Sequence, residues 1–245
     1  MIAKRYAVLL FTACLILGCG GSDPVEMPAP PAEPELTSDL FLVDAAGKAE
    51  VPDDEVRRQI LAVAASGRSA GSLPMVTVDY PFNGTVYPPD MVPPTVRWHD
   101  EAAAAHRWVV DVEFGEGSAH LYLLVPGGPP AAGEIDHRAL GEANELYQPT
   151  EYQASAETWR PSEQAWATIR RNSLGRKTRV TFYGSGEQAP DKALSRGSFT
   201  LTTSEDPVGA PIFYRDVPLM PSATTEGVIQ PLDPGAVPLL SLIHI

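Results

Sequence analysis

The residues from Trp108 to Phe114 constrain the fold more than any other stretch of this 245-residue chain. They read WVVDVEF, so every second residue from Trp108 onward is apolar and falls on one face of an extended chain. Val96 and Trp98 repeat the pattern over a shorter run. Alternation with a period of two predicts a half-buried β-strand, with the intervening residues on a solvent-facing side. The chain is therefore expected to be mainly β.

Turn signals separate several more runs of this kind. Proline and glycine together make up 45 of the 245 residues, which favours short strands joined by turns. The Asn83-Gly84 pair predicts a tight turn. About seven alternating runs with one inserted helix indicate an immunoglobulin-like or fibronectin-like β-sandwich. The further strands are expected at Ala119–Val125, Leu146–Tyr152, Thr178–Gly184, Gly197–Thr203 and Ile212–Val217.

Two helices are predicted. The inserted helix begins after Ser162, whose hydroxyl can cap free N–H groups, and it carries Trp166 and Ile169 on one face. A shorter amphipathic helix is expected over residues 53–66, with Gly67 in the C′ position. It would dock on the sandwich or on a neighbour. Small residues follow it, so the domain boundary is placed near residue 73.

The first nineteen residues indicate export. Lys4 and Arg5 precede an apolar run, Ala7–Leu17, that is too short to span a bilayer and long enough for a signal peptide. The run ends in Leu-Ile-Leu-Gly-Cys, which resembles the bacterial lipobox and implies that Cys19 receives a diacylglycerol thioether. An ordinary signal peptide is the alternative. The protein is thus expected on a bacterial membrane, at the outer membrane or the periplasmic face, held by its acylated cysteine.

Composition excludes several functional classes. The net charge of −13 disfavours nucleic acid as a partner. Both cysteines lie in the first nineteen residues, which leaves the rest without a disulfide framework or a cysteine-based zinc site. The histidines have no metal-ligand spacing, and no Gly-x-Ser-x-Gly motif is present. We therefore expect no catalytic residues, no metal and no cofactor in this chain, and we interpret its many carboxylates as a solvated surface.

Aromatic residues offer a binding hypothesis. Trp159 lies beside Arg160 and Pro161 in a predicted loop, and with Tyr152 and Tyr147 it could stack on sugar rings. The other three tryptophans lie on apolar faces and are expected in the core: Trp98, Trp108 and Trp166. A glycan-binding sandwich is therefore one alternative function.

Between Met75 and Leu219 lie four segments that carry a family resemblance: YPFNGTVYPPDMVPPTVRW, RWVVDVEF, WRPSEQAWATIRRNSLG and TTSEDPVGAPIFYRDVPL. They resemble the N-terminal region of a family of bacterial lipoproteins and exported proteins. In that family an immunoglobulin-like module precedes a c-type haem motif and a TolB-like β-propeller. The Cys-x-x-Cys-His motif has no match here, so the resemblance implies covalent haem only in a part beyond this sequence. An exported c-type cytochrome is the second alternative for the parent protein.

The resemblance and the composition give an expected layout and function. The chain reads as a truncated N-terminal part whose non-catalytic sandwich scaffolds or docks a downstream domain, with glycan as an alternative partner. The expected contact with that domain is Pro211, Ile212, Phe213, Tyr214 and Arg215. The expected divisions are a signal peptide (1–18), a proline-rich tether with a short helix (19–72), a sandwich (73–205), a connector (206–240) and an adapter-like end without structural meaning (241–245).

Overall fold

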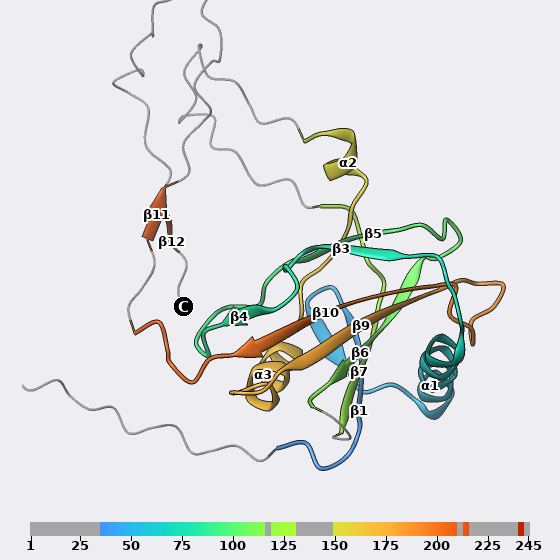
Figure 1. Cartoon of the computed structure of the whole chain (residues 1–245), viewed down its shortest axis with the longest axis horizontal. Coiled ribbons are helices and arrows are strands. Elements are labelled where there is room, and N and C mark those ends of the chain that lie inside the picture. The colour runs from blue at the N-terminus through green and yellow to red at the C-terminus, as the bar shows by residue number, and fades with distance from the viewer. Residues whose placement is uncertain (1–34, 116–118, 131–148, 210–212, 216–239, 243–245) are drawn as a thin grey trace, which may run out of the picture. The chain divides into compact units, whose positions relative to one another are not determined.

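Two β-sheets face each other across an apolar core (Figure 1). The computed structural model describes residues 35–115, 119–130, 149–209, 213–215 and 240–242. The larger sheet has seven strands in the order β2-β1-β7-β6-β9-β10-β4. Its strands are β1 (Leu40–Ala45), β2 (Lys48–Glu50), β4 (Thr85–Tyr87), β6 (Arg107–Glu113), β7 (His120–Val125), β9 (Thr178–Ser185) and β10 (Ser195–Thr203). The expectation of a mainly β protein is confirmed.

The smaller sheet has three strands in the order β3-β5-β8. They are β3 (Val76–Tyr80), β5 (Val96–Asp100) and β8 (Glu157–Trp159), and both pairings are antiparallel. The larger sheet is mixed, because β1 runs parallel to β7 and β4 runs parallel to β10. The strand predicted at Ala119–Val125 is present as β7 and pairs antiparallel with β6. The predicted Asn83-Gly84 turn leads into β4, with Gly84 at a positive φ of 83°.

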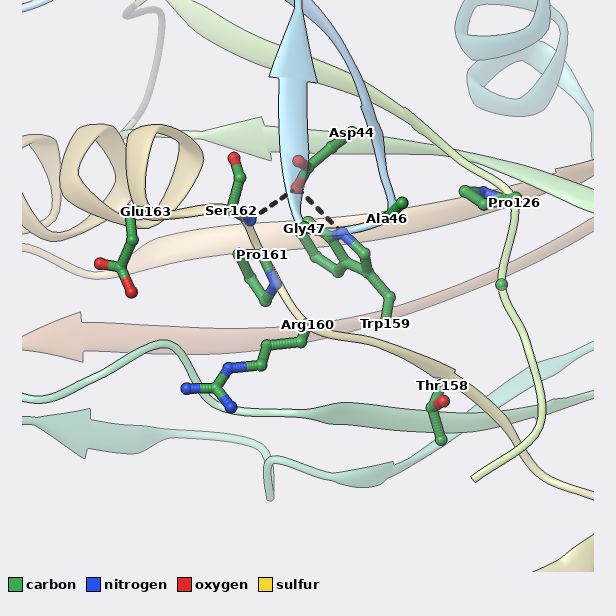
Figure 2. A pocket seen from close by; sticks show the side chains of 11 residues that line it. Asp44, Ala46, Gly47, Pro126, Thr158, Trp159, Arg160, Pro161, Ser162 and Glu163 are labelled. Atoms are coloured by element: carbon green, nitrogen blue, oxygen red, sulfur yellow. Dashed lines mark hydrogen bonds between the residues drawn. The ribbon is translucent and has the colours of Figure 1, made fainter. Parts of the chain in front are cut away.

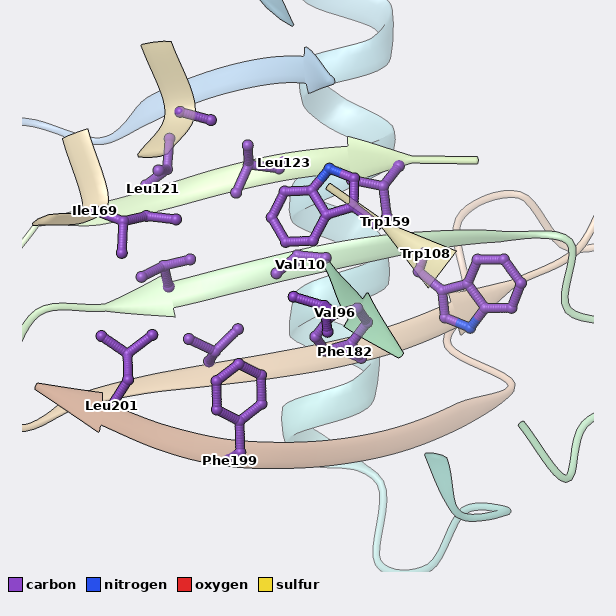
Figure 3. Close-up of a cluster of buried hydrophobic side chains, with 14 of the residues drawn as sticks. Val96, Trp108, Val110, Leu121, Leu123, Trp159, Ile169, Phe182, Phe199 and Leu201 are labelled. Atoms are coloured by element: carbon purple, nitrogen blue, oxygen red, sulfur yellow. The ribbon is translucent and has the colours of Figure 1, made fainter. Parts of the chain in front are cut away.

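Aromatic rings fill the space between the sheets (Figure 3). Trp98 of β5 lies 5.1 Å from Trp108 of β6 and 4.9 Å from Phe182 of β9, measured between ring centroids. All three side chains are almost fully buried. The alternating face of β6 lies in this core as predicted. Branched apolar residues surround the rings: Val96, Val110, Val112, Leu121, Leu123, Val125 and Val180.

Helix α3 (Glu163–Asn172) confirms the predicted inserted helix. Ser162 caps it, accepting a hydrogen bond at Oγ from the Ala165 N–H, and arginines occupy its last turn, where the helix dipole favours cations. Trp166 and Ile169 are buried in the core. The Trp166 indole donates to the Met91 carbonyl oxygen at 2.7 Å.

Helix α1 (Asp54–Ser69) covers the outer face of the larger sheet (Figure 1). Its N-terminus is capped by Asp53, and its apolar side packs on the large sheet through Ile60, Val63 and Ala64. The face of β6 that was expected to meet solvent is therefore buried too, with Val109 1% exposed beneath the helix. The alternating pattern of a strand indicates how polar each of its faces is. It does not indicate whether a helix from another part of the chain covers that face.

Residues that the sequence assigns to the tether belong to the folded unit. Strand β1 pairs with β7, and Leu42 is fully buried in the core between the sheets. A boundary near residue 73 cuts through this unit, which is a correction to the predicted layout. The expected edge strand over Leu146–Tyr152 is also wrong where the structure describes it, because residues 151–154 form helix α2 (Glu151–Ala154).

The C-terminal part contributes one two-stranded pairing. Strand β11 (Phe213–Arg215) pairs antiparallel with β12 (Leu240–Leu242). The predicted strand at Ile212–Val217 is thus confirmed over its described residues. Leu240–Leu242 overlaps the segment that was expected to have no structural meaning. None of the helices in the described part of the chain has the length and hydrophobicity needed to span a membrane.

Gly67 lies inside α1 and not at its C′ position, and the helix continues to a cap at Ala70. The reason is tertiary. A Cβ atom on Gly67 would lie 2.2 Å from Cδ1 of Tyr183, so the missing side chain lets the Tyr183 ring approach the helix. The close packing of α1 on the sheet therefore requires glycine at this position, although glycine is a poor helix former.

Replacing Gly67 with alanine should lower stability. An alanine normally improves a helix interior, but the added methyl would force apart α1 and the buried Tyr183 ring, and we expect a loss of roughly 1–3 kcal/mol. Urea unfolding followed by circular dichroism measures the change. Gly71→Ala is the matched control, because a Cβ there meets no atom within 4 Å. Equal stability of the two variants would contradict the packing argument.

Candidate functional site

A cavity of about 420 Å³ opens at one end of the sandwich (Figure 2). Three chain segments form it: the β1–β2 turn, the residues that follow β7, and the connection from β8 to α3. Its volume falls in the range of small-molecule sites. The lining residues are Asp44, Ala46, Gly47, Pro126, Gly127, Thr158, Trp159, Arg160, Pro161, Ser162 and Glu163.

Local sequence explains why the chain turns at this place. Ala46 and Gly47 have positive φ values of 51° and 73° and form the two-residue turn between β1 and β2. Such turns match the twist of a hairpin, and glycine adopts this backbone without strain. Pro126 ends β7 because proline cannot donate to a strand ladder. The Ala46-Gly47 turn and the end of β7 at Pro126 lie on two sides of the cavity.

Asp44 is the buried acid of the cavity and is 2% exposed. Its Oδ2 accepts hydrogen bonds from the Trp159 indole N–H and from the Ser162 backbone N–H, each at 3.0 Å (Figure 2). Its Oδ1 has no hydrogen-bond donor among the residues that the structure describes. The carboxylate thus joins β1 to β8 and to the start of α3, more than 100 residues further along the chain.

Trp159 does not occupy the exposed loop expected for a glycan platform. It is the last residue of β8, it is 7% exposed, and its ring belongs to the core between the sheets. Its indole N–H is already bonded to Asp44. The prediction of an exposed stacking ring is therefore wrong for Trp159, because β8 pairs with β5 and turns the ring inward.

The other predicted site residues do not gather around the cavity. Tyr152 lies on α2, is 56% exposed and does not line the cavity. Phe213, Tyr214 and Arg215 form β11. The remaining candidates lie outside the described residues: Cys19, Tyr147, Pro211 and Ile212.

Tyr152 belongs to a cluster that ties α2 to the smaller sheet. Its hydroxyl donates to Asp79 Oδ1 at 2.9 Å, and its ring stacks on His99 with centroids 3.9 Å apart. The two His99 ring nitrogens lie 2.8 Å from Asp79 Oδ2 and 2.8 Å from the Tyr152 carbonyl oxygen. The hydrogen bond to the Asp79 carboxylate raises the pKa of Tyr152. These contacts give Tyr152, His99 and Asp79 a structural role, which is to hold α2 against the smaller sheet.

A second cluster lies at the C-terminal end of α1, on the outer face of the larger sheet. Asp111 accepts from Arg68 Nη1 at 2.9 Å, and its other oxygen lies 2.6 Å from His120 Nδ1. Asp111 is 5% exposed, so both partners compensate a buried charge. The hydrogen bond to Asp111 raises the pKa of His120. The alternating pattern predicts a solvent-facing side for Asp111, which is wrong because α1 covers this face. An acid within an apolar run is the sequence signal of its buried place.

The described residues contain no group of three or more histidine, cysteine, aspartate or glutamate side chains that could hold a metal ion. Neither a protein-family model nor a curated protein matches the chain. The chemistry of the described part therefore has to be argued from its own side chains.

The Asp111–His120 pair should make stability depend on pH. Because the folded pKa of His120 lies above the unfolded value of about 6.5, its contribution is complete below that pH and is lost as the pH rises through the folded pKa. Urea unfolding at a series of pH values from acidic to alkaline measures this loss. His120→Gln should flatten that part of the profile, whereas the exposed His106→Gln control should keep it. An unchanged profile in His120→Gln would contradict the assignment.

Asp44→Ala should destabilise the fold by roughly 2–6 kcal/mol, because two buried N–H donors would lose their acceptor at about 1–3 kcal/mol each. Thermal and urea unfolding measure the effect. The exposed Asp206→Ala change is the control and should stay close to wild type. A wild-type midpoint for Asp44→Ala would show that the carboxylate is not a structural tie.

Proposed function

We propose that this chain is a lipid-anchored module of the bacterial cell envelope, which holds a non-catalytic β-sandwich at the membrane and positions a further domain. The observation that carries the proposal is the sequence Leu15-Ile16-Leu17-Gly18-Cys19 after a basic and apolar leader. Two or three acyl chains on Cys19 would hold the protein on a membrane without a spanning helix. The proline-rich residues that follow would separate the sandwich from the lipid.

Strand order supports an immunoglobulin-like fold for the sandwich. In immunoglobulin constant domains one sheet contains strands A, B, E and D and the other contains C, F and G. If β3, β5, β6, β8, β9 and β10 are given the letters A, B, C, E, F and G, the orders β3-β5-β8 and β6-β9-β10 follow the orders A-B-E and C-F-G, with no counterpart of strand D in the described small sheet. Strands β1 and β2 then extend the second sheet beyond β7, and α3 lies in the E–F connection.

The centre of the core supports the same proposal. Antibody domains place a disulfide between strands B and F against a tryptophan of strand C. Here Trp98 and Phe182 come from the B and F equivalents, and Trp108 comes from the C equivalent. An aromatic contact would thus replace the disulfide, in agreement with the absence of cysteine after residue 19.

Chain entry and exit lie at the same end of the sandwich, which suits a positioning role. The Leu36 N–H donates to Asn172 Oδ1 at 2.8 Å, and the Gly175 N–H donates to the Thr203 carbonyl oxygen at 2.8 Å. These bonds hold the residues before β1 next to the end of β10. A domain that follows residue 209 would start from the end of the folded unit that carries Leu36, and we propose Phe213–Arg215 as part of its contact.

Cys19→Ser should abolish lipid attachment. Wild type expressed in a bacterial host should incorporate labelled palmitate and fractionate with membranes, because the thioether needs the Cys19 sulfur. Labelling followed by membrane fractionation measures both properties. The Cys19→Ser protein should remain unlabelled and leave the membrane fraction.

Cys14→Ser is the matched control, since it changes the other cysteine within the same leader. This variant should keep the label and the membrane location. Identical labelling and fractionation of wild type and Cys19→Ser would overturn the lipid anchor, and with it the proposed function.

A further inference from the structure

We propose that the cavity beside Asp44 binds a small zwitterion of the α-amino-acid type. This inference is independent of the lipid anchor. It rests on two groups of opposite charge that line one cavity (Figure 2): the carboxylate of Asp44, whose Oδ1 has no donor among the described residues, and the guanidinium of Arg160.

The carboxylate provides one half of the site. Asp44 Oδ2 is satisfied by two N–H donors, but Oδ1 is buried and accepts no hydrogen bond within the described part of the chain. A buried polar atom without a partner is costly, and an ionised oxygen more so. A ligand ammonium group can supply the missing donors and also neutralise the charge.

The guanidinium provides the other half. Arg160 follows Trp159 directly, is exposed and forms no ion pair with any carboxylate in the residues described. Arginine presents a planar fork of donors that matches a carboxylate. A molecule that carries both an ammonium and a carboxylate on one small frame therefore complements the lining better than either ion alone.

Position and size agree with a binding site. The cavity lies at the ends of β1 and β7, whereas the chain enters beside the start of β1 and leaves after the end of β10. Strand β9 runs in the same direction as β7 and β1, because β6 lies between β9 and β7 and is antiparallel to both. Strand β10 is antiparallel to β9, so it ends where β1 begins. The chain therefore enters and leaves at the end opposite to the cavity. A volume of about 420 Å³ accommodates a molecule of this size.

The indole N–H signal of Trp159 offers a direct reporter, because this group donates to Asp44. The full-length chain, labelled with ¹⁵N, is titrated with L-norvaline, with butylamine, which lacks the carboxylate, and with pentanoate, which lacks the amine. The indole signals of Trp108 and Trp166 serve as internal references, since their N–H groups bond Asp100 and Met91 outside the cavity lining. Norvaline should shift the Trp159 signal saturably and bind at least about tenfold more tightly than either partial probe.

Variants test the two charges separately. Arg160→Gln removes an exposed cation, so this variant should fold normally. Its affinity for norvaline should fall to its affinity for butylamine, because the ligand carboxylate would have lost its partner. Asp44→Asn should lose norvaline binding. Arg179→Gln, an exposed arginine on β9, is the matched control and should bind as wild type does. The proposal would be overturned by the absence of a saturable Trp159 shift, by equal affinities for norvaline and butylamine, or by unchanged affinity in Arg160→Gln.

Discussion

The contact of Trp98 with Trp108 and Phe182 joins the two sheets, and the rest of the structure depends on it. The three rings come from β5, β6 and β9, and so from both layers. Each large apolar side chain that leaves water contributes roughly 1.5–3 kcal/mol, and the surrounding branched residues add their own contributions. Described residues after position 34 contain no cysteine, so packing has to hold the sheets together without a disulfide.

Three buried or half-buried acids complete the assembly around this core. Asp44, Asp100 and Asp111 each accept hydrogen bonds from segments distant in sequence. Asp100 binds the Trp108 indole and the Ser195 hydroxyl, so it fixes one end of β6 and β10 to β5. Because a buried carboxylate is stable only with donors in place, each acid restricts how the elements around it can be arranged.

The two ends of the sandwich have different characters. One end carries the entry and the exit of the chain beside α3, joined by Leu36, Asn172 and Thr203. The other end carries the cavity with Asp44 and Arg160. A module that is held at one end and open at the other suits both proposals, since a tether or a downstream domain at the first end would leave the cavity free.

The sequence by itself determined the strands and the helix that rely on local patterns. The alternation at Trp108–Phe114, the cap at Ser162 and the turn at Gly84 need only backbone geometry and near neighbours, and all three are present. The proposed export signal is likewise a local pattern, confined to the first nineteen residues.

Tertiary structure alone decided which faces are covered and which residues meet. Burial of Trp159, the addition of β1 to the sheet, the helical place of Gly67 and the cavity at Asp44 all depend on contacts across long stretches of chain. A sequence period specifies the direction of a side chain from its own strand or helix. It carries no information on the element that packs against that side chain, and burial, charge compensation and binding are set by that second element.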